Sequence, residues 1–370
     1  MGAILVTGAA GFIGANFARF WRGRNPGDEI VVLDLLTYAG DRRNLDDCAN
    51  VTFIEGDIGD EALVAGLLRE RGIATIVNFA AQTHVDRSID DPDAFLKANV
   101  VGLHGLLKAA RRVWLDRGSG RPHRFHHVST DEVYGSLSPD DPAFSETTAY
   151  APNSPYAASK AAADHFVRAY GQTFGLQATI SNCSNNFGPF QHPEKLIPLF
   201  VINALEGRPL PIYGDGLQVR DWLYVEDHCA AIDLIVRQGR PGESYNVGGG
   251  AELTNLDLIE RLCQVLDGAF AANPALATRF PGAPGASGRA TATLRSHVAD
   301  RPGHDRRYAI DDSKIRAELG YAPSRDFSVS LAATVNWYLD HEDWWRGAMG
   351  DQHQGWLERN YRQRPADVDS

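Results

Sequence analysis

The chain has 370 residues, of which 44% are hydrophobic and 22% charged, and its formal net charge at pH 7 is −11. This length and composition are enough to bury a large core and predict two domains, or one domain with a substantial lobe. The acidic balance argues against nucleic acid or an anionic membrane as the main partner, and no apolar run approaches the roughly 20 residues that span a bilayer.

The cysteines indicate the cellular compartment and whether a metal is bound. Cys48, Cys183, Cys229 and Cys263 are scattered without the spacing of metal ligands, and the first residues do not resemble a signal peptide. We therefore expect a cytoplasmic protein with reduced thiols and no bound metal.

The first elements predict a dinucleotide site. A short apolar strand at residues 3–6 leads into a glycine-rich turn, with Gly8, Gly11 and Gly14 spaced G-x-x-G-x-x-G, and then into a helix through Arg22. Glycines permit a tight turn and a close approach of the backbone to a pyrophosphate, whose charge meets the helix N-terminus.

The second strand, residues 30–33, ends at Asp34, about 20 residues after Gly14, where an acid can hydrogen-bond an adenosine ribose. Because a carboxylate would repel a 2′-phosphate, this position favours NAD over NADP. Asp57 and Ile58 follow a third strand at residues 51–54 and are placed to cap the adenine, although such an aspartate often serves only a turn.

The alternation of strand and helix then continues. Residues 73–81 form the next strand, and the small side chains of Ala80 and Ala81 let the backbone run beside the cofactor. Residues 93–117 predict one long helix before a strand at 125–128. This order predicts an α/β fold with a Rossmann-like, doubly wound parallel sheet.

The chemistry is expected after the strand at 125–128, because ligands bind at the carboxyl ends of strands in open α/β sheets. Thr130, Asp131 and Glu132 leave the sheet there. Ser154 and Pro155 then predict an N-cap and first turn for a helix over residues 156–174, closed by Gly175. Tyr156 and Lys160 consequently lie one turn apart on one face of that helix.

This spacing has a chemical use. A phenol with a pKa of about 10 is a poor base at neutral pH unless a neighbouring cation favours the phenolate. Lys160 can be that cation, and an oxidised nicotinamide adds a second, so Tyr156 can take a hydroxyl proton while hydride leaves the same carbon. The alternative is an ordinary helix with a packed tyrosine and a solvated lysine.

With these motifs in place, the chain resembles the extended short-chain dehydrogenase/reductases and, within them, the dTDP-glucose 4,6-dehydratase family. The resemblance covers residues 3 to about 345 and is carried by seven segments: 36–40, 84–89, 129–135, 182–189, 193–198, 220–228 and 301–305. The acid pair Asp131 and Glu132 is the most discriminating feature, since a related 4-epimerase needs the Tyr and the Lys but eliminates no water.

The resemblance implies a role for each matched residue. Tyr156 would take the C4 hydroxyl proton, Glu132 the C5 proton, and Asp131 would protonate the departing C6 hydroxyl, while Thr130 binds the sugar O4. Implied cofactor contacts are Gly8, Gly11, Phe12, Ile13, Gly14, Asp34, Leu36, Thr37, Gly40, Asp57, Ile58, Ala80, Ala81, Thr83, Tyr156, Lys160 and Asn186. Implied substrate contacts are His84, Thr130, Asn185, Lys195, Leu196, Pro211, Tyr213, Arg220, Asn255, Arg301 and His304.

The domain organisation follows from the same comparison. Residues 1–185 would form the NAD-binding domain, 186–345 mainly a smaller mixed α/β substrate lobe with some segments returning to the first domain, and 346–370 a polar tail. The stretch 271–293, rich in Ala, Gly and Pro, departs from the family and predicts an extra loop. The helices beginning near Asp93 and Pro155 would supply an isologous homodimer interface.

Three interpretations fit the residues, and we favour the first, because Asp131 and Glu132 argue against an epimerase and the intact set of Asp131, Glu132, Tyr156 and Lys160 argues against an inactive protein. The first is a dTDP-glucose 4,6-dehydratase that keeps its NAD bound and makes dTDP-4-keto-6-deoxyglucose. The second is a 4-epimerase, or a dehydratase of a UDP-, CDP- or GDP-sugar. The third is a catalytically inactive NAD-binding protein, since a fold can be retained after its activity is lost.

Overall fold

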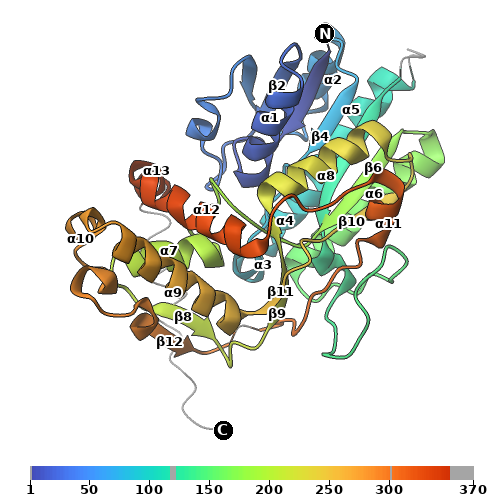
Figure 1. Cartoon of the computed structure of the whole chain (residues 1–370). Coiled ribbons are helices and arrows are strands. Elements are labelled where there is room, and N and C mark those ends of the chain that lie inside the picture. Colours follow the sequence, from blue (N-terminus) through green and yellow to red (C-terminus); the bar gives the residue numbers. More distant parts are fainter. Residues whose placement is uncertain (1, 117–121, 301, 351–370) are drawn as a thin grey trace.

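A computed structural model of the chain describes residues 2–116, 122–300 and 302–350 (Figure 1). Its largest feature is a seven-stranded sheet in the order β10-β6-β5-β4-β1-β2-β3, in which every pair of neighbours is parallel. The strands are β1 (Ala3–Thr7), β2 (Glu29–Asp34), β3 (Val51–Glu55), β4 (Thr75–Asn78), β5 (Arg124–Thr130), β6 (Ala178–Cys183) and β10 (Ser244–Val247). The predicted Rossmann-like doubly wound sheet is therefore confirmed.

Helices cover both faces of this sheet. Leu5 of β1 packs with α2 (Glu61–Glu70), α5 (Leu103–Trp114) and α6 (Pro155–Phe174) in one apolar core. Its neighbours Ile4 and Val6 point the other way, into a second core with α1 (Phe12–Arg24) and α8 (Val225–Gln238). Alternate residues of a strand face opposite sides, so a sheet covered on both faces requires the continuous apolar runs of β1 and β2.

The helix that carries Tyr156 forms as predicted. Ser154 Oγ accepts a hydrogen bond from the backbone N–H of Ala157, Pro155 occupies the first turn, and Gly175 ends α6 in the left-handed conformation. These contacts satisfy groups that a helix terminus otherwise leaves without partners.

The long helix predicted over residues 93–117 is present, but its first half is not regular α-helix. The chain forms α3 (Val85–Asp90) and α4 (Pro92–Phe95), then π-helical turns at Leu96–Gly102, and only then α5. The π-helical segment carries Asn99, whose side chain bonds both the backbone of Gln82 and the hydroxyl of Ser159. Apolar periodicity does not distinguish such i→i+5 turns from regular α-helix.

A smaller lobe lies beneath the large sheet in Figure 1. Its strands form two small sheets, β11-β9-β7 and β12-β8. Its elements are β7 (Asn185–Phe187), α7 (Leu196–Leu205), β8 (Leu210–Tyr213), β9 (Val219–Tyr224), β11 (Glu252–Thr254), α9 (Asn255–Ala272), β12 (Arg295–Val298), α12 (Phe327–Asp340) and α13 (Glu342–Ala348). Phe187, Phe200, Leu262, Tyr338 and Trp345 are among the side chains of its core.

The two lobes are interleaved along the chain. After β9, the chain returns to the large sheet as α8 and β10, and α11 (Ser313–Leu319) packs against both of them. Residues near 307–310 make two further bridges, Val219 to Arg307 and Phe144 to Ile310. The smaller lobe is thus built from two stretches of the chain, one between β6 and α8 and the other after β10.

Residues 271–293 differ from the extra loop that their composition predicts. They contain α10 (Ala275–Arg279) and two 3₁₀ turns, η4 (Pro284–Ser287) and η5 (Thr291–Leu294), and Leu276, Phe280 and Ala283 are buried in the core of the smaller lobe. The few apolar residues in this stretch are spaced so that they reach α9, which a count of Ala, Gly and Pro does not reveal.

At the C-terminal end, α13 continues through Ala348, and most of the predicted polar tail, from residue 351 on, lies outside the described residues. Within the described part of the chain, none of the helices combines the length and apolar character needed to cross a bilayer.

Candidate active site

The predicted catalytic residues meet at the carboxyl end of β5. Thr130 ends that strand, Asp131 and Glu132 begin the 3₁₀ turn η3 (Asp131–Tyr134), and Tyr156 projects from the first turn of α6. The hydroxyls of Tyr156 and Thr130 are hydrogen-bonded, and Thr130 Oγ1 lies 3.3 Å from Asp131 Oδ1. One strand end and one helix N-terminus therefore bring a phenol, a hydroxyl and two carboxyls together.

The two adjacent acids have different surroundings. Asp131 is buried, with 1% of its surface exposed, whereas Glu132 is half-buried. Burial first, and then the negative charges of Glu132 and Asp221, raise the pKa of Asp131 well above its usual range. Asp131 Oδ2 accepts no hydrogen bond from the described residues. Asp131 therefore keeps its proton under conditions in which a more exposed carboxyl loses it.

The Tyr156 and Lys160 pair is also buried. Burial, followed by the charge of Glu132, raises the pKa of the Tyr156 phenol well above 10, and burial lowers the pKa of Lys160 to about 8. Lys160 Nζ donates to Val128 O over 2.8 Å and lies 3.1 Å from His127 Nε2. Tyr156 thus becomes a base only with help from positive charge close by.

Sequence reasoning missed two residues beside Lys160. His127 lies on β5 and Asp164 on α6, and both are buried. The spacing of Lys160 and Asp164, four residues apart on a helix, was the available signal, because residues at this spacing share a face.

The glycine-rich turn fits a pyrophosphate. Gly8 has φ +70°, and a Cβ there would lie 2.5 Å from the backbone nitrogen of Ala80; at Gly14 a Cβ would lie 2.7 Å from the carbonyl oxygen of Gly8. Gly11 is the N-cap of α1 and has no side chain to accept a hydrogen bond from the first turn, so the backbone N–H groups of Phe12 and Ile13 keep their capacity for an anion.

Asp34 lies at the end of β2 with 8% of its surface exposed. Its Oδ2 accepts from the N–H of Ala10 and its Oδ1 from the N–H of Leu36, each over 2.9 Å. These bonds fix the carboxylate beside the glycine-rich turn, where a ribose would lie. Leu36 has a positive φ of 52°, which is rare for a leucine, and a Thr37 to Gly40 hydrogen bond closes the turn that follows it.

The remaining cofactor candidates line the ends of neighbouring strands. Ala80 and Ala81 follow β4, next to Gly8. Asp57 accepts from the N–H of Gly59 and so closes a turn that contains the buried Ile58. The Asn186 amide is held by His228, 2.8 Å away, and the carbonyl of Thr83 accepts from Lys195 Nζ. Whether Asp57 also reaches the adenine stays a prediction.

A buried carboxylate links the cofactor side to the smaller lobe. Glu194 accepts from Tyr38 OH over 2.8 Å and from Arg87 Nε over 3.0 Å, and Arg87 lies over the Tyr38 ring. We call Tyr38, Arg87 and Glu194 the Glu194 cluster. It ties the turn after Asp34 to the segment just before Lys195.

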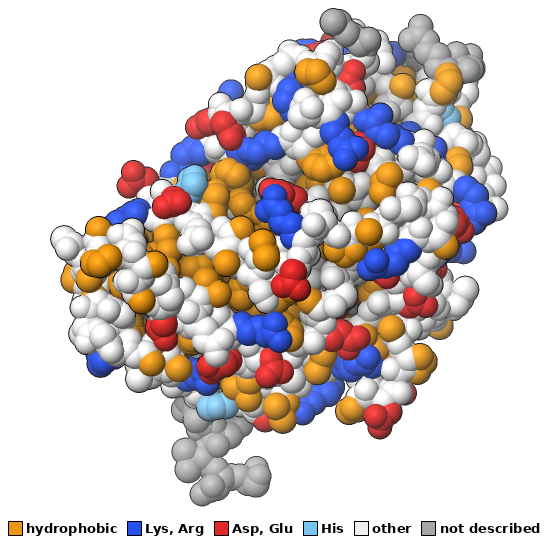
Figure 2. Space-filling view, in the orientation of Figure 1, with side chains coloured by type: hydrophobic (Ala, Val, Ile, Leu, Met, Phe, Trp, Pro, Cys, Tyr) orange, Lys and Arg blue, Asp and Glu red, His pale blue; other side chains and the backbone are white. Residues whose placement is uncertain are grey.

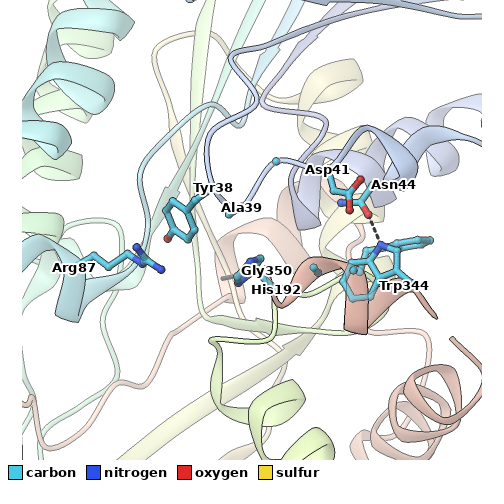
Figure 3. Close-up of a pocket in the computed structure, with 12 residues that line it drawn as sticks. Tyr38, Ala39, Asp41, Asn44, Arg87, His192, Trp344 and Gly350 are labelled. Carbon is cyan, nitrogen blue, oxygen red and sulfur yellow. Dashed lines mark hydrogen bonds between the residues drawn. The ribbon is translucent and has the colours of Figure 1, made fainter. Parts of the chain in front are cut away.

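A pocket of about 310 Å³ lies beside the Glu194 cluster (Figure 3). Tyr38, Asp41 and Asn44 come from one side of it, and His192 and Trp344 from the other, with the Trp344 indole donating to Asn44 Oδ1. This pocket does not include the catalytic residues. It marks the junction of the turn after Asp34 with α13.

Substrate candidates gather on the smaller lobe. Tyr213 OH donates to Asp86 Oδ2 over 3.2 Å, and the Tyr213 ring meets the ring of His304 edge to face. Asn255 is buried at the start of α9, and its side-chain oxygen accepts no hydrogen bond from the described residues. Pro211 lies on β8, Leu196 begins α7, and Asn185 begins β7.

The three predicted cations are placed differently. Lys195 is the N-cap residue of α7. Arg220 is buried, donates to the backbone oxygens of Val219 and Asp305, and stacks 4.2 Å above Tyr308, a neighbour that sequence reasoning missed. Arg301 lies outside the described residues. A phosphate role for these cations stays a prediction.

Charged side chains of both signs are interspersed on the face seen in Figure 2, with no large area of one sign.

Comparisons with known proteins agree with the geometry. A family model described as GDP-mannose 4,6 dehydratase matches residues 5–334. A dTDP-glucose 4,6-dehydratase of Xanthomonas campestris pv. campestris (strain B100) is 49% identical over 364 residues, covering 97% of this chain and 99% of that protein. Two solved structures titled dTDP-glucose 4,6-dehydratase are also similar. DesIV from Streptomyces venezuelae, with NAD and TYD bound, is 46% identical with a TM-score of 0.82, covering 94% of this chain and 99% of that one. The enzyme from Bacillus anthracis, in complex with NAD, is 41% identical with a TM-score of 0.80, covering 94% and 100%.

Proposed function

The chain belongs to the family of the dTDP-glucose 4,6-dehydratases, and from this premise we propose how its residues divide the reaction. It is an NAD-dependent hydro-lyase: C4 of the sugar is oxidised, water is eliminated across C5 and C6, and dTDP-4-keto-6-deoxyglucose results. When bound, NAD supplies the hydride acceptor for C4 and returns the hydride to C6, so it ends each turnover unchanged.

Tyr156 begins the reaction by taking the C4 hydroxyl proton, with Thr130 holding the same oxygen. The cation of Lys160 stabilises the phenolate, offsetting the burial that otherwise raises the pKa of Tyr156. Loss of the C4 hydride leaves a ketone, which makes the C5 proton acidic.

Glu132 and Asp131 then carry out the elimination. Glu132 removes the C5 proton as a base, and Asp131 donates its proton to the C6 hydroxyl as that group leaves as water. The contrast between buried Asp131 and half-buried Glu132 is the single observation that carries this proposal, since elimination needs one acid and one base together. A 4-epimerase has no use for this pair.

The chain's own residues would hold the cofactor and the nucleotide. The turn from Gly8 to Gly14 receives the pyrophosphate of NAD and Asp34 the ribose. On the smaller lobe, Lys195, Arg220 and Arg301 bind the diphosphate of the substrate. Tyr213, Asn255 and His304 contact its base and ribose. This division keeps cofactor contacts mainly within 1–185 and nucleotide contacts mainly within 186–345.

The test is to incubate the purified protein with dTDP-glucose in heavy water, without added NAD. We expect a 4-keto-6-deoxy product that carries solvent deuterium at C5, because Glu132 exchanges that proton. UDP-, CDP- and GDP-glucose serve as parallel substrates. Turnover of one of these in place of dTDP-glucose would reassign the nucleotide, and a 4-epimer without loss of water would refute the dehydratase chemistry.

We further propose a cytoplasmic homodimer that supplies precursors of deoxysugars. Leu96, Val101 and Phe166 are large apolar side chains exposed on the outer helices, and Val101 is 65% exposed. Such residues suit an isologous interface. All four cysteines are unpaired and buried, as expected of a reducing compartment. Light scattering of the wild type and of Val101→Lys tests the dimer, which the lysine should dissociate.

A further inference from the structure

A fully buried carboxylate lies behind the active site. Asp164 is on α6, one turn after Lys160, and none of its surface is exposed. Its Oδ2 accepts three hydrogen bonds, from Ser129 Oγ over 2.8 Å, Tyr150 OH over 3.0 Å and Asn182 Nδ2 over 3.2 Å. Its Oδ1 accepts none from the described residues and lies 3.5 Å from His127 Nε2. Three hydrogen bonds thus fix Oδ2, whereas Oδ1 remains available to a positively charged group.

Lys160 supplies the positive charge that acts on this carboxylate. Three titratable groups act on the ammonium from the elements around it: His127 from β5, Cys183 from β6 and Asp164 from its own helix. Burial lowers the pKa of His127 and raises that of Cys183, so both are neutral near pH 7. Burial raises the pKa of Asp164, but the charge of Lys160 and the three hydrogen-bond donors oppose that rise by favouring the carboxylate. Asp164 is therefore the member of this set that can balance the lysine.

We propose that Asp164 is the counter-ion that keeps Lys160 protonated, and that His127 fixes the direction of the ammonium group. The two residues act on Tyr156 only through Lys160 and are therefore positioning residues. This inference deepens the proposed function and rests on it for the role of Lys160. A buried ammonium without an anion loses its proton more readily, because desolvation disfavours the charged form.

The proposal also assigns a tautomer to His127. For Nε2 to accept from the ammonium, the imidazole proton must be on Nδ1, which lies 3.0 Å from the Asn78 amide. The structure assigns Asn78 the opposite orientation, in which its Oδ1 accepts from Thr7 Oγ1 over 2.6 Å and its Nδ2 faces His127 Nδ1. The proposal therefore requires the Asn78 amide to be flipped, so that its oxygen accepts from His127 Nδ1 and its nitrogen donates to Thr7 Oγ1. A chain of bonds consequently runs from β1 through β4 and β5 to Lys160.

The direct test is the titration of Lys160 itself. The chain contains only five lysines, Lys97, Lys108, Lys160, Lys195 and Lys314, so each Nζ resonance of ¹⁵N-lysine-labelled protein can be followed by NMR. Lys160→Met assigns the signal. We expect a midpoint of about 8 in the wild type and one lower by roughly 1 to 3 pH units in Asp164→Asn, as for loss of a nearby opposite charge. An unchanged midpoint overturns the proposal.

Two controls separate charge from packing. Tyr150→Phe removes one donor to Asp164 but keeps the carboxylate, so the Lys160 midpoint should stay close to that of the wild type. Asp233→Asn removes a different buried carboxylate, which pairs with Arg237 on α8, and should also leave it unchanged. A shift of equal size in either control overturns the proposal. Should Asp164→Asn not fold, Asp164→Ser replaces it, because the smaller hydroxyl side chain leaves room for water.

The pH profile of turnover supplies a second readout. Loss of the Lys160 proton removes the charge that Tyr156 needs, so kcat falls on the alkaline side. In Asp164→Asn this limb should move to lower pH with KM for the sugar unchanged, and turnover above it should fall roughly tenfold per unit. An alkaline limb at the wild-type position overturns the proposal. The two proposals can also fail separately. If the Lys160 midpoint shifts in Asp164→Asn but the wild type does not dehydrate dTDP-glucose, this inference is upheld and the proposed function is refuted.

Discussion

Replacing Glu194 by Gln tests the Glu194 cluster. Burial opposes ionisation of this carboxyl, but the charges of His84, His192, Lys195 and Arg87 outweigh it and lower its pKa to about 2, against 4.5 for a free glutamate. The difference of roughly 2.5 units corresponds to about 3 kcal/mol of stability at neutral pH. Because burial lowers the pKa of His84 to about 4, that imidazole is uncharged at pH 7, and about 3 kcal/mol is an upper bound.

The pH dependence follows from the direction of the shift. A carboxyl whose pKa is lower in the folded state contributes stability above its unfolded pKa, and this contribution is lost as the pH falls through 4.5 toward about 2. The difference in free energy of unfolding between wild type and Glu194→Gln should therefore be constant from about pH 8 to 5.5 and shrink below 4.5.

Equilibrium unfolding in guanidinium chloride at several pH values measures this difference. Glu226→Gln is the matched control, since the ion pair of Glu226 with Arg325 is about half exposed, with side-chain exposures of 48% and 44%. That control should cost less than about 1 kcal/mol. If Glu194→Gln costs no more than Glu226→Gln at pH 7, the cluster does not stabilise the junction as argued.

Three further changes test the site and its support. Glu132→Gln should lower product formation roughly 10²- to 10⁴-fold while still allowing transient formation of reduced nicotinamide, seen by absorbance; normal turnover would show that Glu132 is not the base. Ser154→Ala removes the cap of α6 and should cost about 1 kcal/mol in thermal unfolding, with an unchanged melting temperature arguing against the cap. Gly14→Ala places a Cβ 2.7 Å from the Gly8 carbonyl oxygen and should weaken NAD binding measured by calorimetry, whereas wild-type affinity would contradict the close packing of this turn.

The sequence predicts the sheet and the place of the proposed catalytic residues at the end of β5 well because their signals are local. Apolar strands, the glycine-rich turn and the Ser154 cap each depend on neighbours a few residues away. The π-helical turns at Leu96–Gly102 were not predictable in this way, since apolar spacing does not report hydrogen-bond register. Similarly, the order in residues 271–293 depends on contacts with α9.

The side chains that contact the site residues from behind were the least predictable feature of the site. His127 and Asp164 flank Lys160, and Glu194 meets Tyr38 and Arg87 from segments far away in the chain. A motif identifies residues that contact ligands, but the groups behind them are chosen by packing between strands and helices. Arg220 illustrates the point, because its position over Tyr308 follows from the path of residues 305–308 along β9.

The separation of β6 and β10 along the chain, by residues 184–243, has a consequence for synthesis on the ribosome. The edge of β6 that faces away from β5 pairs only with β10. That edge therefore has no partner strand while residues 184–243 are translated. An unpaired strand edge is a template for pairing with other chains. Nascent chains that stall in this interval therefore expose the unpaired edge of β6. For the same reason, we expect the first 185 residues, expressed by themselves, to aggregate rather than to form an independent cofactor-binding domain.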